Sequence, residues 1–137
     1  ETPSSLPIVI KTPSVDLQDD PAYLERFLME EWIAKRISSA HVLKPCELKR
    51  KRHYLYTAFE FIDGQTLTQW MIDNPKPSLQ SVREIVGQIA KGLQAFHRLE
   101  MLHQDIRPEN IMIDRFNGDD SVYRASKYIR HRSIHRT

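Results

Sequence analysis

One short segment of the chain places several chemically capable side chains close together in sequence. Residues 101–114 read MLHQDIRPENIMID, and their polar side chains include Asp105, Arg107 and Asn110. A carboxylate and an amide oxygen are hard ligands that suit Mg²⁺, and a carboxylate can also orient a hydroxyl group. The planar fork of an arginine fits the oxygens of a phosphate. The segment is therefore a candidate for phosphate chemistry.

A plainer interpretation fits the same residues. Asp and Asn side chains often make hydrogen bonds within turns, and a surface loop would contain them for that reason alone. Asp105 and Asn110 are five positions apart, which requires neither helical nor strand alignment. The spacing by itself leaves both interpretations open.

The first part of the chain predicts a strand and then a helix. Residues 6–11, LPIVIK, are apolar and rich in β-branched side chains, which is typical of a strand. Asp20 followed by Pro21 is typical of a helix start, with an acidic N-cap and proline at the first position. The helix is predicted over residues 22–39.

The middle of the chain predicts more strands and then helices. Residues 41–45 and 53–62 are interpreted as two strands of a hairpin joined by a basic turn. The pair Asp63-Gly64 indicates a turn before a short helix. Ser78 begins a long amphipathic helix, whose apolar residues recur at helical spacing. The helix is predicted to end near His97-Arg98. Strands first and helices later favour an α+β fold in two parts.

The composition limits the class of protein. The chain has 137 residues, 40% hydrophobic and 28% charged, which suits one domain or part of one. Its single cysteine, Cys46, excludes an internal disulfide and fits a reducing compartment, so we expect a cytoplasmic protein. No apolar run is long enough to span a bilayer, so we expect no membrane association. Residues 121–137 hold five Lys or Arg and no acidic residue. We interpret them as a solvated tail and expect no nucleic-acid partner.

Four segments, in order, resemble motifs of the eukaryotic-type protein kinases. HQDIRPEN at 103–110 resembles the catalytic loop H-R-D-L-x-x-x-N, and IVIK at 8–11 resembles the strand motif V-A-I-K. FLMEEWIAKRI at 27–37 resembles the helix of the small lobe, and FEFIDGQTL at 59–67 resembles the hinge between the lobes. The resemblance implies an incomplete bilobal protein-kinase fold. It would comprise part of the N-lobe sheet with its helix, the hinge, the first C-lobe helices and the catalytic loop.

The resemblance also implies an activity. An enzyme of this family transfers a phosphoryl group from Mg-ATP to a protein hydroxyl, and RPEN resembles the K-P-E-N of Ser/Thr kinases. Asp105 would accept or orient the proton of the substrate hydroxyl. Arg107 would carry positive charge toward the γ-phosphate, and Asn110 would hold Mg²⁺.

The remaining family positions would bind ATP. Lys11 would contact the α- and β-phosphates, with Glu30 as its charged partner. Without the other motifs, such a pair would be interpreted as a solvated ion pair worth about 0–1 kcal/mol. Backbone groups of Glu60 and Ile62 would read the adenine edge, and Phe59 would be the gatekeeper.

Three positions in or beside the catalytic loop depart from the family or need a separate interpretation. Arg107 stands where Ser/Thr kinases commonly have a lysine, and an arginine is bulkier and forked. Gln104 replaces an arginine that in the family receives an activation-loop phosphate, which implies control without that phosphorylation. His103 is expected to be a structural core histidine.

Two family elements are not found in the sequence. A Gly-rich loop would lie upstream, and the metal-binding aspartate of D-F-G would fall near Tyr123. We therefore expect residues 1–114 to be a partial kinase domain and residues 115–137 to be a basic tail unlike a kinase, frameshifted or disordered. The apolar stripe of the long helix would be left partly uncovered, so we expect the fragment alone to be marginally stable and inactive.

Several other interpretations stay open. The longer segments 15–37 and 95–110 resemble bacterial Ser/Thr kinase domains that follow a metal-dependent phosphatase domain in one polypeptide. This resemblance implies a phosphatase domain in the parent polypeptide. A protein substrate is implied by the kinase family as a whole. A pseudokinase-like binding module, or a dead fragment, is the alternative to an enzyme. A small-molecule kinase of the aminoglycoside-phosphotransferase type shares the catalytic Asp and Asn. The RPEN after Asp105 fits the protein kinases better, because the aminoglycoside-type enzymes usually show H-G-D with a His two residues after the Asp.

Overall fold

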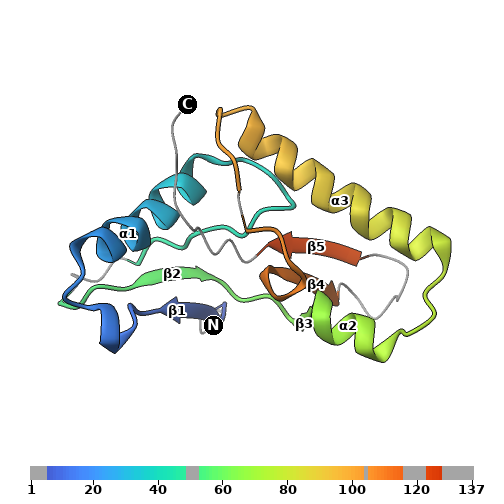
Figure 1. Cartoon of the computed structure of the whole chain (residues 1–137), viewed down its shortest axis with the longest axis horizontal. Coiled ribbons are helices and arrows are strands. Elements are labelled where there is room, and N and C mark those ends of the chain that lie inside the picture. The colour runs from blue at the N-terminus through green and yellow to red at the C-terminus, as the bar shows by residue number, and fades with distance from the viewer. Residues whose placement is uncertain (1–5, 49–52, 104, 116–122, 128–137) are drawn as a thin grey trace, which may run out of the picture.

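The first strand and the helices follow the order that the sequence predicts, whereas the later strands differ from the prediction. The computed structural model of the chain describes residues 6–48, 53–103, 105–115 and 123–127 (Figure 1). The helices are α1 (Pro21–Arg36), α2 (Leu67–Asp73) and α3 (Leu79–His97), with short 3₁₀ turns η1 (Val15–Leu17) and η2 (Pro108–Asn110). The strands are β1 (Ile8–Lys11), β2 (Thr57–Glu60), β3 (Gly64–Thr66), β4 (Ile111–Arg115) and β5 (Tyr123–Lys127).

Within the described residues the strands form two antiparallel sheets. One sheet has two strands, β1 and β2, and the other has three, in the order β3-β4-β5. Figure 1 shows α1 beside the β1–β2 pair at one end, and α2 beside the second sheet at the other. The α+β prediction is confirmed.

The start of α1 follows its sequence signal. The Oδ1 atom of Asp20 accepts hydrogen bonds from the backbone N–H groups of Ala22 and Tyr23, at 3.0 and 3.3 Å. Pro21 occupies the first helical turn, where its missing N–H costs nothing. The helix ends at Arg36, three residues before the predicted end.

The predicted hairpin of residues 41–45 and 53–62 is only partly correct. Residues 41–45 form no strand, and only Pro45 makes an isolated bridge, to Phe59 of β2. Proline has no N–H to continue a ladder. The adjacent residues Val42 and Leu43 are both buried, each in a different core cluster, so the segment does not alternate inward and outward like a half-buried strand.

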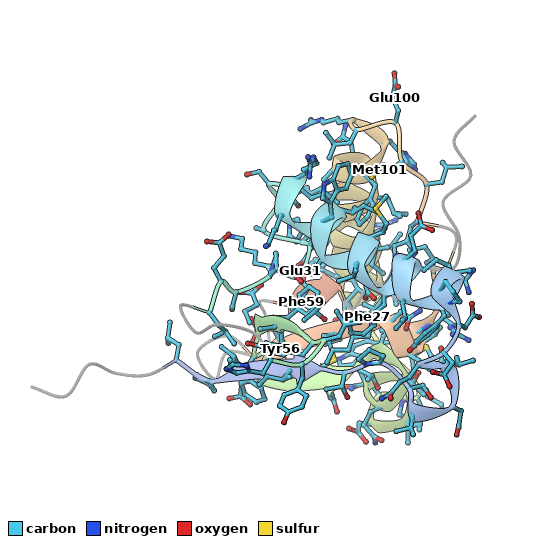
Figure 2. All side chains as sticks on the ribbon, turned by 90° about the vertical axis from the view of Figure 1, so that its left-hand side faces the viewer. Phe27, Glu31, Tyr56, Phe59, Glu100 and Met101 are labelled. Carbon is cyan, nitrogen blue, oxygen red and sulfur yellow. The ribbon has the colours of Figure 1, made fainter. Side chains whose placement is uncertain are left out.

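The buried apolar side chains of the described residues form three clusters. The first joins α1 to α3, the second joins α2, α3 and β4, and the third joins α1 to β2. In Figure 2, Phe27 and Phe59 lie between the ribbon of α1 and the strands beneath it. The members of the three clusters are Ile33, Ile37, Val42 and Phe96; Trp70, Ile85, Ile111 and Ile113; and Ala34, Leu43 and Phe59.

Helix α3 buries one side and exposes the other. Its N-cap Ser78 accepts a hydrogen bond from the N–H of Ser81 at 3.0 Å, as expected of a helix start. Ile85 and Phe96 are buried, whereas Val82 and Val86 of the predicted apolar stripe are exposed. In the part of the chain that the structure describes, neither α3 nor any other helix is both long and apolar enough to cross a bilayer.

Gly64 is required where β3 approaches β4. A Cβ atom at this position would lie 1.9 Å from the carbonyl oxygen of Ile113, far inside van der Waals contact. We expect Gly64→Ala to lower the free energy of unfolding by about 1–3 kcal/mol, because the strands must move apart. Chemical denaturation of the full polypeptide measures the change.

The matched control is Gly87→Ala in α3. A Cβ atom there meets nothing within 4 Å, and the residue is exposed. Alanine should therefore stabilise the helix by about 0.5–1 kcal/mol. Equal effects at the two positions would contradict the close approach at Gly64.

Candidate active site

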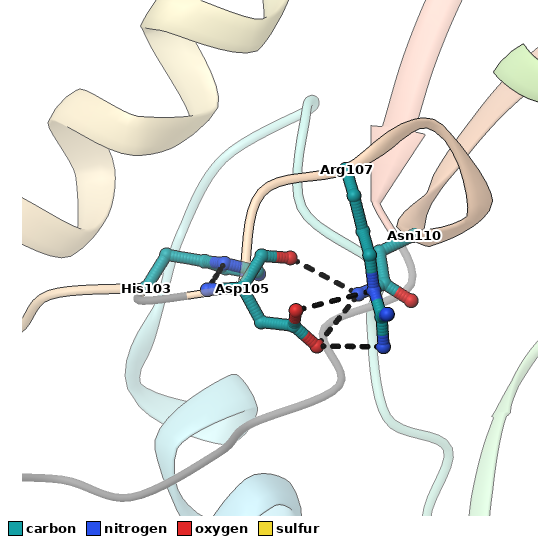
Figure 3. Close-up of polar contacts among 4 residues, drawn as sticks. All are labelled: His103, Asp105, Arg107 and Asn110. Carbon is teal, nitrogen blue, oxygen red and sulfur yellow. Dashed lines mark hydrogen bonds and ion pairs between the residues drawn. The ribbon is translucent and has the colours of Figure 1, made fainter.

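The candidate catalytic loop connects α3 to β4, and His103 anchors it in the core. The His103 side chain is 2% exposed, and its ring meets the edge of Phe96 with centroids 5.6 Å apart. Its Nδ1 accepts a hydrogen bond from the backbone N–H of Asp105 at 3.1 Å, which fixes the direction of the next residues (Figure 3). The location supports the structural role expected for this histidine.

The carboxylate of Asp105 is engaged at both oxygens. Oδ1 lies 3.2 Å from Nε of Arg107, and Oδ2 lies 3.3 Å from one of its terminal nitrogens. Oδ2 also accepts a hydrogen bond from Nδ2 of Asn110 at 3.0 Å (Figure 3). The structure therefore brings together the three predicted residues of this loop.

Asn110 is oriented by two hydrogen bonds. It is 4% exposed, and its Nδ2 donates to the backbone carbonyl of Asp105 as well as to the carboxylate, at 3.0 Å each. In Figure 3 its amide oxygen points away from Asp105. That oxygen is a hard ligand and fits Mg²⁺, which usually takes few protein ligands and fills its shell with phosphate oxygens and water. Among the described residues there is no group of three or more His, Cys, Asp or Glu side chains that would form a closed metal cage.

Lys11 and Glu30 form the second predicted group. Nζ of Lys11 lies 2.5 Å from Oε2 of Glu30, and these side chains are 20% and 10% exposed. The same ammonium lies 5.8 Å from the centroid of the buried Phe27 ring. Phe27 and Glu30 are three positions apart, so they share one face of α1. That spacing could have identified Phe27 as a neighbour of Lys11.

The hinge residues follow β2. The backbone N–H of Glu60 donates to the carbonyl of Lys44, and Oε1 of Glu60 accepts from the N–H of Lys44, both at 3.0 Å. Ile62 is half-buried and packs against the cluster that contains Phe59. The predicted adenine contacts of Glu60 and Ile62 use backbone atoms and stay a prediction.

Cys46 lies beside this hinge. Burial, and then the negative charge of Glu60, raise the pKa of its thiol above the ordinary value. A raised pKa keeps the thiol protonated and therefore weakly nucleophilic. Cys46 is half-buried, and its environment suits a structural residue rather than a nucleophile.

Comparison with known proteins identifies the family. The sequence model of the family described as "Protein kinase domain" matches residues 2–125 of the chain. The chain belongs to the protein kinase family. The match runs past residue 114, where we expected the kinase-like part to end, and that boundary stays a prediction.

The kinase relatives include several bacterial Ser/Thr kinases. Over 115 residues the chain is 28% identical to the serine/threonine-protein kinase PrkC of Bacillus subtilis, covering 81% of this chain and 17% of that protein. A probable serine/threonine-protein kinase of Clostridium acetobutylicum is 25% identical over 121 residues, covering 88% of this chain and 18% of the relative. The chain therefore spans less than a fifth of the length of either relative.

A solved kinase structure confirms the fold. The PknI kinase domain of Mycobacterium tuberculosis superimposes with a TM-score of 0.63 at 25% identity, covering 88% of this chain and 47% of that domain. The chain thus has a partial protein-kinase fold that corresponds to about half of a kinase domain.

The position near residue 123, where the family would place the D-F-G aspartate, lies at the start of a strand, and the absence of that aspartate stays a prediction. Tyr123 begins β5, which pairs with β4 from Arg115↔Tyr123 to Ile111↔Lys127. Residues 128–137, which lie outside the described residues, contain no Asp or Glu.

Proposed function

We propose that this chain is part of an ATP-dependent protein Ser/Thr kinase and supplies its catalytic loop and its phosphate-binding lysine. The observation that carries the proposal is the arrangement of one loop, on which side-chain nitrogens of Arg107 and Asn110 lie 3.0–3.3 Å from the carboxylate of Asp105. The Lys11–Glu30 pair supports it, because an ammonium held by a carboxylate is positioned for a phosphate rather than left to move in solvent.

The residues of the loop account for the reaction. The substrate hydroxyl oxygen forms a bond to the γ-phosphorus, the bond from that phosphorus to the bridging oxygen breaks, and ADP leaves with that oxygen. Asp105 orients the hydroxyl and receives its proton. Arg107 offers positive charge to the γ-phosphate, and Asn110 would hold Mg²⁺ through its amide oxygen. The bound metal ion would neutralise charge on the phosphates.

The remaining residues bind and align the nucleotide. Lys11 contacts the α- and β-phosphates, and Glu30 keeps its ammonium in place. Backbone atoms of Glu60 and Ile62 hold the adenine, so side-chain changes at these two positions should matter little. Positioning and charge stabilisation supply most of the rate in phosphoryl transfer.

One observation favours a binding module as the second candidate. Residues 121–137, where the family would place the D-F-G aspartate, contain no acidic side chain. A chain with Lys11, Glu30, Asp105 and Asn110 but without that metal ligand could bind a nucleotide or a protein without transferring phosphate.

The test is an assay of the natural full-length polypeptide that contains this chain. It is incubated with radiolabelled ATP, Mg²⁺ and casein, and the labelled residues are identified after acid hydrolysis. We expect phosphoserine or phosphothreonine, and no label when EDTA removes Mg²⁺. Binding of Mg-ATP without any transfer would favour the binding module, and label on tyrosine alone would contradict the Ser/Thr assignment.

The other expectations about the parent protein also stay predictions. They are a protein substrate, a cytoplasmic location and a phosphatase domain in the same polypeptide. The relatives support the first through their family alone, and nothing in them supports the phosphatase domain.

A further inference from the structure

The guanidinium of Arg107 covers the carboxylate on which the proposed reaction depends. Its Nε and one terminal nitrogen each face a different oxygen of Asp105, at 3.2 and 3.3 Å. This two-point contact needs the planar fork of an arginine, because a lysine ammonium is a compact point charge. The departure from the family's lysine therefore has a visible consequence in this structure.

The contact conflicts with the role of Asp105 as proton acceptor. Oδ2 accepts hydrogen bonds from both Arg107 and Asn110, and Oδ1 faces Arg107. A substrate hydroxyl must reach one of these oxygens at about 2.6–3.2 Å. With the guanidinium in place, three of the roughly four acceptor sites of the carboxylate are engaged, so the hydroxyl would share Oδ1 with a charged donor that makes this oxygen a weaker proton acceptor.

The exposure of the two side chains shows which one can move. The Asp105 side chain is 16% exposed and is also held by Asn110, whereas the Arg107 side chain is 49% exposed. A half-exposed ion pair is weak, and a phosphate carries more charge than a carboxylate. A phosphate group placed beside the loop could therefore attract the arginine away from Asp105.

We propose that Arg107 is a nucleotide-operated switch on Asp105. Without ATP its guanidinium occupies both carboxylate oxygens; with ATP it turns to the γ-phosphate and frees Asp105 for the substrate hydroxyl. The inference rests on the proposed function, and it adds that binding of the γ-phosphate and release of Asp105 are coupled. ADP lacks the γ-phosphate and leaves the switch closed.

The coupling can be measured by binding alone, without turnover. The full-length polypeptide is prepared as wild type, Asp105→Asn, Arg107→Gln and the double variant. Isothermal titration calorimetry then measures the affinity of each for Mg²⁺ with the β,γ-imido analogue of ATP, and for Mg-ADP. Removing the charge of Asp105 reduces repulsion of the phosphates in any background, so the diagnostic quantity is the difference between the two arginine backgrounds.

The switch predicts a specific pattern. Asp105→Asn should tighten binding of the ATP analogue by about two- to fivefold more when Arg107 is present than when it is glutamine, because the arginine no longer has to leave a carboxylate. The ADP affinities should show no such difference. Arg83→Gln, at an exposed position of α3, is the control for loss of one positive charge and should leave the pattern unchanged.

Each other outcome overturns a definite statement. An equal effect of Asp105→Asn in both backgrounds, with the ATP analogue still bound, overturns the switch and leaves the proposed function standing. The same difference with ADP as with the analogue overturns the role of the γ-phosphate. Absence of binding by all four proteins overturns the switch together with the proposed function.

Discussion

On the proposed function, Asp105→Asn is expected to lower the turnover number of the full-length polypeptide by about 10²–10⁴-fold, the usual contribution of a general acid or base. Asparagine has nearly the same shape and keeps an oxygen toward Asn110, but it cannot receive the hydroxyl proton. The Michaelis constant for ATP should not rise, because Asp105 is not needed to bind the nucleotide. Initial rates with radiolabelled ATP and casein measure both quantities.

The control for this variant is Asp16→Asn. Asp16 is an exposed residue of η1, and the same chemical change there should leave the rate unaltered. A rate for Asp105→Asn within a factor of about ten of wild type would contradict the catalytic assignment, because the reduction in rate would be smaller than the loss of a general base causes. Loss of activity with loss of folding would show as a changed unfolding curve.

Phe96→Ala is expected to be the most destabilising single change, with a loss of about 3–5 kcal/mol in the free energy of unfolding. The Phe96 side chain is fully buried between α1 and α3 and also supports the ring of His103. Its removal leaves a cavity in the cluster that joins these two helices. Urea titration of the full-length polypeptide, followed by tryptophan fluorescence, measures the change, because Trp70 is buried in a neighbouring cluster.

The control lies on the same helix. Val86 is 57% exposed, and Val86→Ala should change the free energy of unfolding by less than about 0.5 kcal/mol, as for most surface positions. Similar losses for the two variants would contradict the assignment of Phe96 to the core. A kinase that loses activity in Phe96→Ala at temperatures where it stays folded would indicate that the position of His103 matters to catalysis.

Local signals in the sequence were sufficient for most of the elements. Asp20 and Pro21 predicted the start of α1, and Ser78 predicted the start of α3, because a helix cap is a contact between near neighbours in sequence. Strand β1 was predicted from its β-branched residues. These features depend on a few adjacent residues, so no knowledge of the rest of the fold was needed.

Non-local contacts explain what the sequence could not predict. The segment 41–45 has the composition of a strand, yet its side chains fill two separate clusters made by distant helices. Strand β5 was not predicted, because its pairing with β4 depends on the length of the connection. In both cases the deciding partner lies far away in sequence.

The residues of the candidate site likewise include some that the sequence predicted and a contact that it could not predict. The spacing of Asp105 and Asn110 left two interpretations open, and only the resemblance to a family distinguished them. The pairing of Lys11 with Glu30 was likewise expected from the resemblance and is present in the structure. The two-point contact of Arg107 with Asp105 had no signal in the sequence, because side-chain direction two positions along a loop depends on the backbone of that loop.

The pairing of β3 with β4 has a consequence for the geometry of the whole proposed nucleotide site. β3 begins two residues after Ile62, and β4 begins directly after Asn110, with Gln65 opposite Ile113. The register of these two strands therefore fixes the distance between the proposed adenine contact at Ile62 and the proposed metal ligand Asn110. A slip of one residue would displace Asn110 by about 3.3 Å and turn the side chain of Ile113 out of the core. Because Ile113 is buried beside Trp70 and Ile85, apolar packing outside the proposed site sets the distance between its two ends.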